Sequence, residues 1–193
     1  NYHDGVARRE GYDDYPRKSF IDHFLNETVD SEALQKAQLH EIVPAAESLY
    51  EIENFKREHK EINLKYELNE SVGNETSVHL TLYKTYIFNR SSVHVYYRLT
   101  NEGAEHGRIV FAPEINLSAA SAAPESHRIF EMVDRKKREL GNDTFDKDGI
   151  SEFSLHDFTN DVIISVHSSK EFLLTGAPVF SVSRSMDEME RIY

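Results

Sequence analysis

Cysteine and tryptophan are both absent from the sequence. Without cysteine, the chain has no disulfide framework, no thiol nucleophile and no thiolate ligand for a metal ion. Long apolar runs are also missing, since none approaches the ~20 residues that a membrane-spanning helix needs. The first ten residues lack the apolar stretch of a signal peptide. We therefore expect a soluble, cytoplasmic protein whose function does not depend on thiol chemistry.

Basic residues are scarce relative to acidic ones. The 193-residue chain has 22 Lys and Arg against 34 Asp and Glu, which gives a formal net charge of −12. Phosphate binding needs an excess of Lys and Arg, so this balance argues against nucleic acids and anionic membranes as partners. Neutral partners remain open. With 39% hydrophobic residues, the chain is long enough for one large domain or two small ones.

Apolar and polar residues alternate along much of the chain, which is typical of half-buried β-strands. In "EINLKYEL" the alternating apolar residues are Ile62, Leu64, Tyr66 and Leu68. The pattern recurs in residues 77–88 and 92–99, where the link "NRSS" predicts a hairpin. Residues 150–158 and 161–169 flank "TN" and predict a second hairpin. The sequence therefore predicts an antiparallel all-β fold.

Three further segments need separate predictions. Residues 108–120 are apolar on both faces and predict a central strand covered on both sides. Residues 30–40 predict a short helix, because Asp30 or Ser31 precedes a run of good helix formers. Residues 127–143 are compatible with a solvated helix, but Phe130 and Met132 alternate, which favours a hairpin.

The segment "TFDKDGISEFSL" is the best candidate for a metal site. It places Asp146, Asp148 and Gly149 at positions 3, 5 and 6 of a calcium loop. However, Thr144 and Leu155 occupy positions 1 and 12, where calcium requires carboxylates. We therefore expect a turn before a strand and no metal. HExxH, a serine-nucleophile elbow and a phosphate-binding glycine loop are absent from the sequence, so we expect no catalytic residues and no cofactor.

Four stretches carry a resemblance to a known family. These are the opening segment (residues 11–25), "FAPEINLSAAS", "FSLHDFTNDVIISV" and the closing "APVFSVSRSMDEMERIY". Together they resemble the C-terminal domain of glycoside hydrolase family 57 enzymes of the 4-α-glucanotransferase and α-amylase group. The resemblance spans nearly the whole chain. Residues 186–189 depart from the family pattern, which places a ligand role for that loop in doubt.

The resemblance implies a twisted antiparallel β-sandwich of the galactose mutarotase-like kind, with a short N-terminal helical segment. It places the catalytic glutamate and aspartate in a preceding (β/α) barrel, which this sequence lacks. The chain is then a non-catalytic accessory domain that supports the barrel of the same polypeptide. Residues 1–30 would be the arm leading from the catalytic part and residues 31–193 the sandwich, with one strand or more following. Whether the parent is a transferase or a hydrolase stays open.

The resemblance also implies candidate contact residues. In the resembled enzymes the opening segment joins the catalytic part to the sandwich, so its polar residues are candidates for contacts between domains, and Phe20 and Phe24 for anchoring a helical turn at i and i+4. The alternative is a hydrated N-terminal arm. The candidates for carbohydrate or interdomain contact are Arg17, Asp22, His23, Glu114, Asn116 and Ser183.

The residues themselves are also compatible with two other functions, a carbohydrate-binding module and a mutarotase-like enzyme. A carbohydrate-binding module would stack sugars on exposed aromatics, and the candidates for such a platform are Tyr83, Tyr86, Tyr96 and Tyr97. A mutarotase-like enzyme would use a histidine and a glutamate as acid and base, and its candidate histidines are His79, His94, His156 and His167. Tyrosine is an ordinary strand former, and histidine also occurs on polar strand faces.

Overall fold

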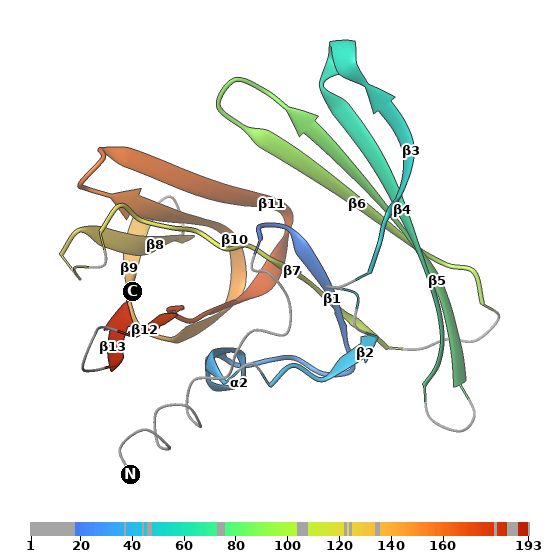
Figure 1. Ribbon diagram of the computed structural model, residues 1–193, viewed down its shortest axis with the longest axis horizontal. Helices are drawn as coiled ribbons and strands as arrows, with labels where there is room; N and C mark the ends of the chain where they lie inside the picture. Colours follow the sequence, from blue (N-terminus) through green and yellow to red (C-terminus); the bar gives the residue numbers. More distant parts are fainter. Residues whose placement is uncertain are drawn as a thin grey trace. The chain divides into compact units, whose positions relative to one another are not determined.

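The computed structural model describes residues 18–36, 38–43, 45, 48–72, 76–103, 108–121, 123, 125–133, 136–179, 181–184 and 189–192. The described strands form four antiparallel sheets, which confirms the all-β prediction (Figure 1). The chain divides into two compact units. One contains residues 21–27 and 40–114, which we call the β1 unit, and the other contains the remaining described residues, which we call the β10 unit. No helix among the described residues has the length and apolar character needed to cross a membrane.

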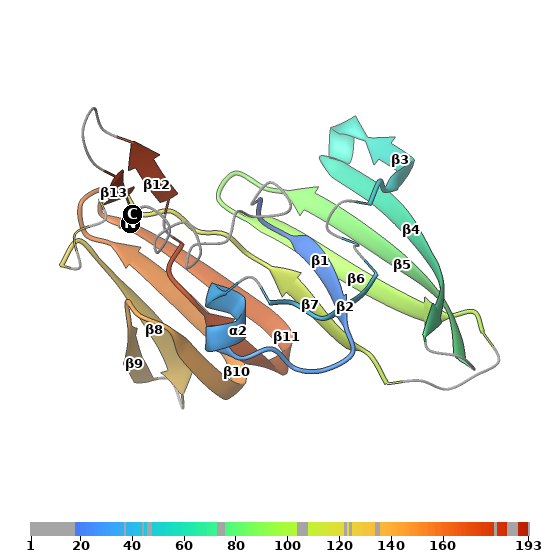
Figure 2. The same cartoon turned by 60° about the horizontal axis from the view of Figure 1, so that its bottom comes forward.

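The β1 unit is a sandwich of a three-stranded and a four-stranded sheet. The smaller sheet has the order β2-β1-β7, and Figure 2 shows these strands side by side. Its strands are β1 (Ile21–Leu25), β2 (Glu41–Val43) and β7 (Val110–Glu114). The larger sheet has the order β3-β4-β5-β6. Its strands are β3 (Glu51–Lys56), β4 (Glu61–Val72), β5 (Thr76–Phe88) and β6 (Val93–Asn101), with the 3-10 turn η2 (Arg57–His59) between β3 and β4.

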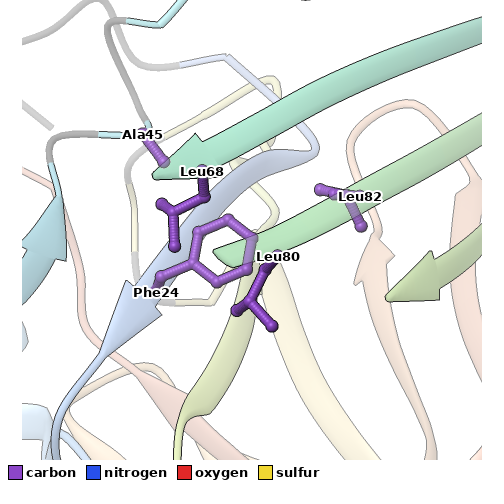
Figure 3. Close-up of a cluster of buried hydrophobic side chains, with 5 residues drawn as sticks. All are labelled: Phe24, Ala45, Leu68, Leu80 and Leu82. Carbon is purple, nitrogen blue, oxygen red and sulfur yellow. The ribbon is translucent and has the colours of Figure 1, made fainter. Parts of the chain in front are cut away.

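The core of this unit lies between its two sheets. Phe24 of β1 is fully buried and lies between leucines of β4 and β5 (Figure 3). Its ring also packs 5.4 Å from that of Phe111 on β7. Cross-strand pairing aligns Leu68 with Leu80, so the alternating apolar residues predicted from the sequence form the inner face of the larger sheet.

The β10 unit contains a four-stranded sheet, a two-stranded sheet and one short described helix. The larger sheet has the order β11-β10-β8-β9. Its strands are β8 (His127–Val133), β9 (Lys136–Gly141), β10 (Phe145–Asp157) and β11 (Val162–Gly176), while β12 (Ser181–Arg184) pairs with β13 (Met189–Ile192). Helix α2 (Ser31–Gln35) begins after Asp30, whose side chain accepts a hydrogen bond from the Ala33 N–H. The Asp30 cap and the hairpin over residues 127–143 are therefore confirmed.

Three local predictions are wrong. The helical turn between Phe20 and Phe24 is replaced by strand β1, because Phe24 pairs with Val43 and Phe111 on neighbouring strands. Residues 108–120 contain only the short strand β7, which lies at a sheet edge. Pro113 within β7 has no N–H to donate to a further strand, which suits an edge position.

The third correction concerns the expected turn at "DKDG". Strand β10 runs continuously through these residues, and its register with β11 shifts between Lys147 and Ile150. Gly149 has a φ of 69°, a conformation that glycine adopts without steric cost. The glycine therefore accommodates a β-bulge inside the strand and does not end it.

Candidate functional site at strand β1

Strand β1 carries two buried charged residues next to each other. Asp22 is 3% exposed and His23 is 2% exposed. Consecutive side chains of a strand point to opposite faces of its sheet. Asp22 therefore shares a face with Phe24 and meets the larger sheet, whereas His23 lies on the other face of the β2-β1-β7 sheet. One short strand thus supplies two separate polar clusters.

His23 connects the strands on both sides of β1. Its Nδ1 atom is hydrogen-bonded to Glu41 of β2, and its Nε2 atom lies 2.9 Å from Oε2 of Glu114 on β7. Only a protonated imidazole can donate from both nitrogens at once. The arrangement therefore holds a positively charged ring between two carboxylates, across all three strands of the sheet.

The electrostatics of His23 agree with this geometry. Burial by itself lowers the pKa of His23, but the hydrogen bonds that its ring donates to Glu114 and Glu41, together with the charges of these carboxylates, outweigh burial and raise the pKa to about 9. The imidazole is therefore charged at neutral pH. Burial without such partners would favour the neutral ring instead.

Asp22 forms the second cluster with the buried lysine of β5. The Lys84 ammonium lies 2.6 Å from Asp22 Oδ2, and the Tyr50 hydroxyl donates a 2.5 Å hydrogen bond to the same oxygen. Lys84 is only 2% exposed. Burial lowers the pKa of Lys84, and Asp22 offsets part of that effect. The ion pair therefore neutralises two charges inside the sandwich.

Three tyrosine rings surround the Lys84 ammonium. Its Nζ atom lies 5.5 Å from the ring centre of Tyr50 and 5.3 Å from those of Tyr86 and Tyr97. At these distances the faces of the rings attract a cation. Burial, and then the negative charge of Asp22, raise the pKa of Tyr86 and Tyr97 above the usual value. The rings stay neutral and enclose the lysine.

Of the six predicted contact residues, His23 and Glu114 come together across β1 and β7, whereas Asp22 lies in the separate cluster with Lys84. Sequence reasoning missed their partners Glu41, Tyr50 and Lys84, which lie elsewhere in the chain. One signal was present: Lys84 occupies an inward position after Leu80 and Leu82. A lysine on an apolar face needs a carboxylate partner.

The other predicted contact residues lie apart from this site. Asn116 follows β7, donates from Nδ2 to the Lys18 carbonyl oxygen at 2.9 Å, and accepts at its own carbonyl from Ser19 Oγ at 2.7 Å. Ser183 belongs to β12, opposite Glu190 of β13. Arg17 lies outside the described residues.

The candidate platform tyrosines divide between the two faces of the larger sheet. Tyr86 and Tyr97 face inward around Lys84, whereas Tyr83, paired with Arg98, lies on the opposite face together with Tyr96. The four tyrosines therefore do not form one surface. The candidate histidines all lie on strands, in β5, β6, β10 and β11.

The predicted calcium loop has another interaction in the structure. Both carboxylate oxygens of Asp146 accept from the Ser31 N–H, at 3.0 and 3.1 Å, and Ser31 Oγ donates at 2.7 Å. Asp146 therefore binds the first residue of helix α2. Burial by itself raises the pKa of Asp146, but the hydrogen bonds from Ser31 lower it below the usual value. The described residues contain no cluster of three or more His, Asp or Glu that could hold a metal ion.

Two packed sheets with buried charges that connect their strands define a β-sandwich domain. The chain belongs to the alpha-amylase/4-alpha-glucanotransferase C-terminal family, whose model matches residues 1–193. It is also similar to the crystal structure of 4-alpha-glucanotransferase from Thermococcus litoralis, with a TM-score of 0.73 and 18% identity. The match covers 97% of this chain and 26% of that chain, so at this identity the two share the fold. The comparison with curated proteins gave no match.

Proposed function

We propose that this chain is a non-catalytic accessory domain of an α-glucan-processing enzyme, a 4-α-glucanotransferase or an α-amylase. The observation that carries the proposal is the match of a C-terminal-domain family to the entire chain. The chain also spans about a quarter of the length of the glucanotransferase that it resembles in fold. Its partner would be the catalytic (β/α) barrel of the same polypeptide.

The buried charges favour a supporting role over a catalytic one. Asp22 and His23 are almost fully enclosed, at 3% and 2% exposure, and each is paired with groups of its own domain. A catalytic acid or base must come within hydrogen-bond reach of its substrate. In the proposed role, these residues fix β1, which follows the opening segment, in the sandwich. The catalytic domain would then be joined to a rigid strand.

Three finer assignments belong to the same proposal. The parent enzyme would be a member of glycoside hydrolase family 57, the sandwich would be of the galactose mutarotase-like kind, and the protein would act in the cytoplasm. The resemblance of residues 11–25 and 177–193 to that family supports the first two assignments. The absence of cysteine is compatible with the third.

Incubation of the purified chain with maltoheptaose tests the non-catalytic role. Chromatography of the products should show maltoheptaose alone, because the catalytic carboxylates would belong to the barrel. Oligosaccharides of altered length would refute the proposal. Accelerated interconversion of glucose anomers that is lost on substitution of His79, His94, His156 or His167 would favour a mutarotase instead.

A further inference from the structure

We propose that the outer face of the β4-β5-β6 sheet binds a chain of neutral hexopyranose units, as in an α-glucan. We call this surface the Tyr83 face and define it by residues on the side of the sheet opposite Lys84: Asn63, Lys65, Tyr83, Thr85, Tyr96 and Arg98. The inference deepens the proposed function, since it rests on an α-glucan-processing parent for its choice of ligand.

Planar groups form the centre of the Tyr83 face. The guanidinium carbon of Arg98 lies 4.1 Å from the centre of the Tyr83 ring, so the two groups are stacked. Tyr96 lies two residues before Arg98 on β6, on the same face, and is 57% exposed. Tyr83 and Tyr96 are diagonal neighbours, about 7–8 Å apart across the two strands. Tyr83, Arg98 and Tyr96 are therefore neighbours on one face of the sheet.

Hydrogen-bonding groups are available on the Tyr83 face. Within the described residues, Arg98 makes no salt bridge, and the hydroxyls of Tyr83 and Tyr96 have no hydrogen-bond partner. Beside Tyr96, the Thr85 hydroxyl donates to Asn63 Oδ1 at 2.7 Å. Ligand sites commonly combine apolar ring surfaces with a few oriented polar groups. Sugar rings present the matching combination of C–H faces and hydroxyls.

The charges on this face favour a neutral ligand. Lys65 is paired with Glu67 at 2.5 Å, which neutralises the cation next to Tyr83. Glu61, at the end of the same strand face, is paired with Lys56 at 2.6 Å. An anionic ligand would therefore meet one unpaired arginine in a chain of net charge −12, and a cationic ligand would meet Arg98. A polyhydroxyl chain can accept hydrogen bonds from Arg98 without a charge of its own.

Titration calorimetry of the whole chain with maltoheptaose tests this inference. We expect saturable binding that Tyr96→Ala and Arg98→Ala each weaken at least about fivefold, since each removes one aromatic or cation-ring contact. The matched control is Phe55→Ala. Phe55 is 59% exposed on the same sheet but pairs with Ile62 on the inner face, so its loss should leave glucan binding unchanged. Circular dichroism and thermal unfolding establish that each variant is folded.

Three outcomes would overturn the inference: no saturable binding, binding that neither Tyr96→Ala nor Arg98→Ala weakens, or an equal loss with Phe55→Ala. A separate assay keeps the proposed function distinguishable. The catalytic barrel, supplied on a second chain, acts on maltoheptaose in the presence of each variant. If the wild-type chain supports that activity but does not bind maltoheptaose, the accessory role stands and the Tyr83 face is wrong.

Discussion

At the scale of single residues, His23 is a buried charged group that connects three strands of the β1 unit. Its ring bridges Glu41 and Glu114 on two different strands, and both partners favour its charged form. A hydrogen-bonded charge pair inside a protein is stabilising only while both partners keep their charge. Protonation of one imidazole is therefore linked to the stability of the whole three-stranded sheet.

The stability of the protein should fall as the pH rises above neutrality. The pKa of His23 increases from 6.5 in the unfolded chain to about 9 in the folded one. Its stabilising contribution is therefore complete below pH 6.5 and is lost as the pH passes through about 9, a change of roughly 3 kcal/mol. Urea unfolding of the wild type and of His23→Gln at pH 6, 7.5 and 9 measures this change in the free energy of unfolding. The same pH dependence in both proteins would show that another group binds the proton.

Asp22 and Lys84 should depend strongly on each other. Asp22→Asn leaves the buried Lys84 ammonium without its counter-charge, so we expect a loss of about 3–5 kcal/mol in the free energy of unfolding. The double variant with Lys84→Met should lose less than the sum of the single variants. The control is Lys36→Met, which breaks the exposed Lys36–Glu32 pair on α2 and should have a small effect. Additive losses at Asp22 and Lys84 would contradict the ion pair.

At the scale of elements, the strands with alternating apolar and polar residues could be predicted from the sequence, whereas strand β1 could not. Residues 61–68 and 77–88 follow the period of two because each strand buries one face against a core. Residues 21–25 mix Asp22 and His23 with apolar residues, which is typical of a solvated arm. Their partners, Lys84 and Glu114, are far away in sequence, and no local pattern can indicate such pairings.

The candidate site was also predictable only in part: some of its residues could be predicted, but their pairing could not. The family resemblance selected Asp22, His23 and Glu114, but it could not indicate that His23 pairs with Glu114 while Asp22 pairs with Lys84 on the other face of the sheet. The β-bulge at Gly149 could not be predicted from the sequence either, because "DKDG" suits a turn equally well. Pairing of β10 with β11 on both sides of the bulge keeps the strand continuous.

Asp146 should stabilise helix α2 without any requirement for calcium. Its carboxylate accepts hydrogen bonds from Ser31 at the start of the helix, so Asp146→Ala should lower the free energy of unfolding by about 1 kcal/mol. The loss should be equal with and without added calcium. Asp148→Ala is the control, because within the described residues the Asp148 carboxylate accepts a hydrogen bond only from the neighbouring Gly149 N–H. Calcium-dependent stabilisation that Asp146→Ala abolishes would restore the metal-site interpretation.

At the scale of the whole molecule, the proposed role is that of a β-sandwich attached to a catalytic domain that would supply the chemistry. The net charge of −12 disfavours polyanionic partners and leaves neutral glucans and other protein domains. A β-sandwich fold alone is compatible with many functions. Membership of the amylase/glucanotransferase C-terminal family is what favours these two classes of partner over the others.

The most direct test of the accessory role is a complementation assay. The catalytic barrel of the parent enzyme, produced without this domain, is mixed with the separate chain and supplied with maltoheptaose. We expect the chain alone to be inactive, the barrel alone to be weakly active or unstable, and the mixture to form products faster or for longer than the barrel alone. Asp22→Asn, which loosens β1, should reduce this effect. A barrel whose activity and thermal stability are the same with and without the chain would contradict the account.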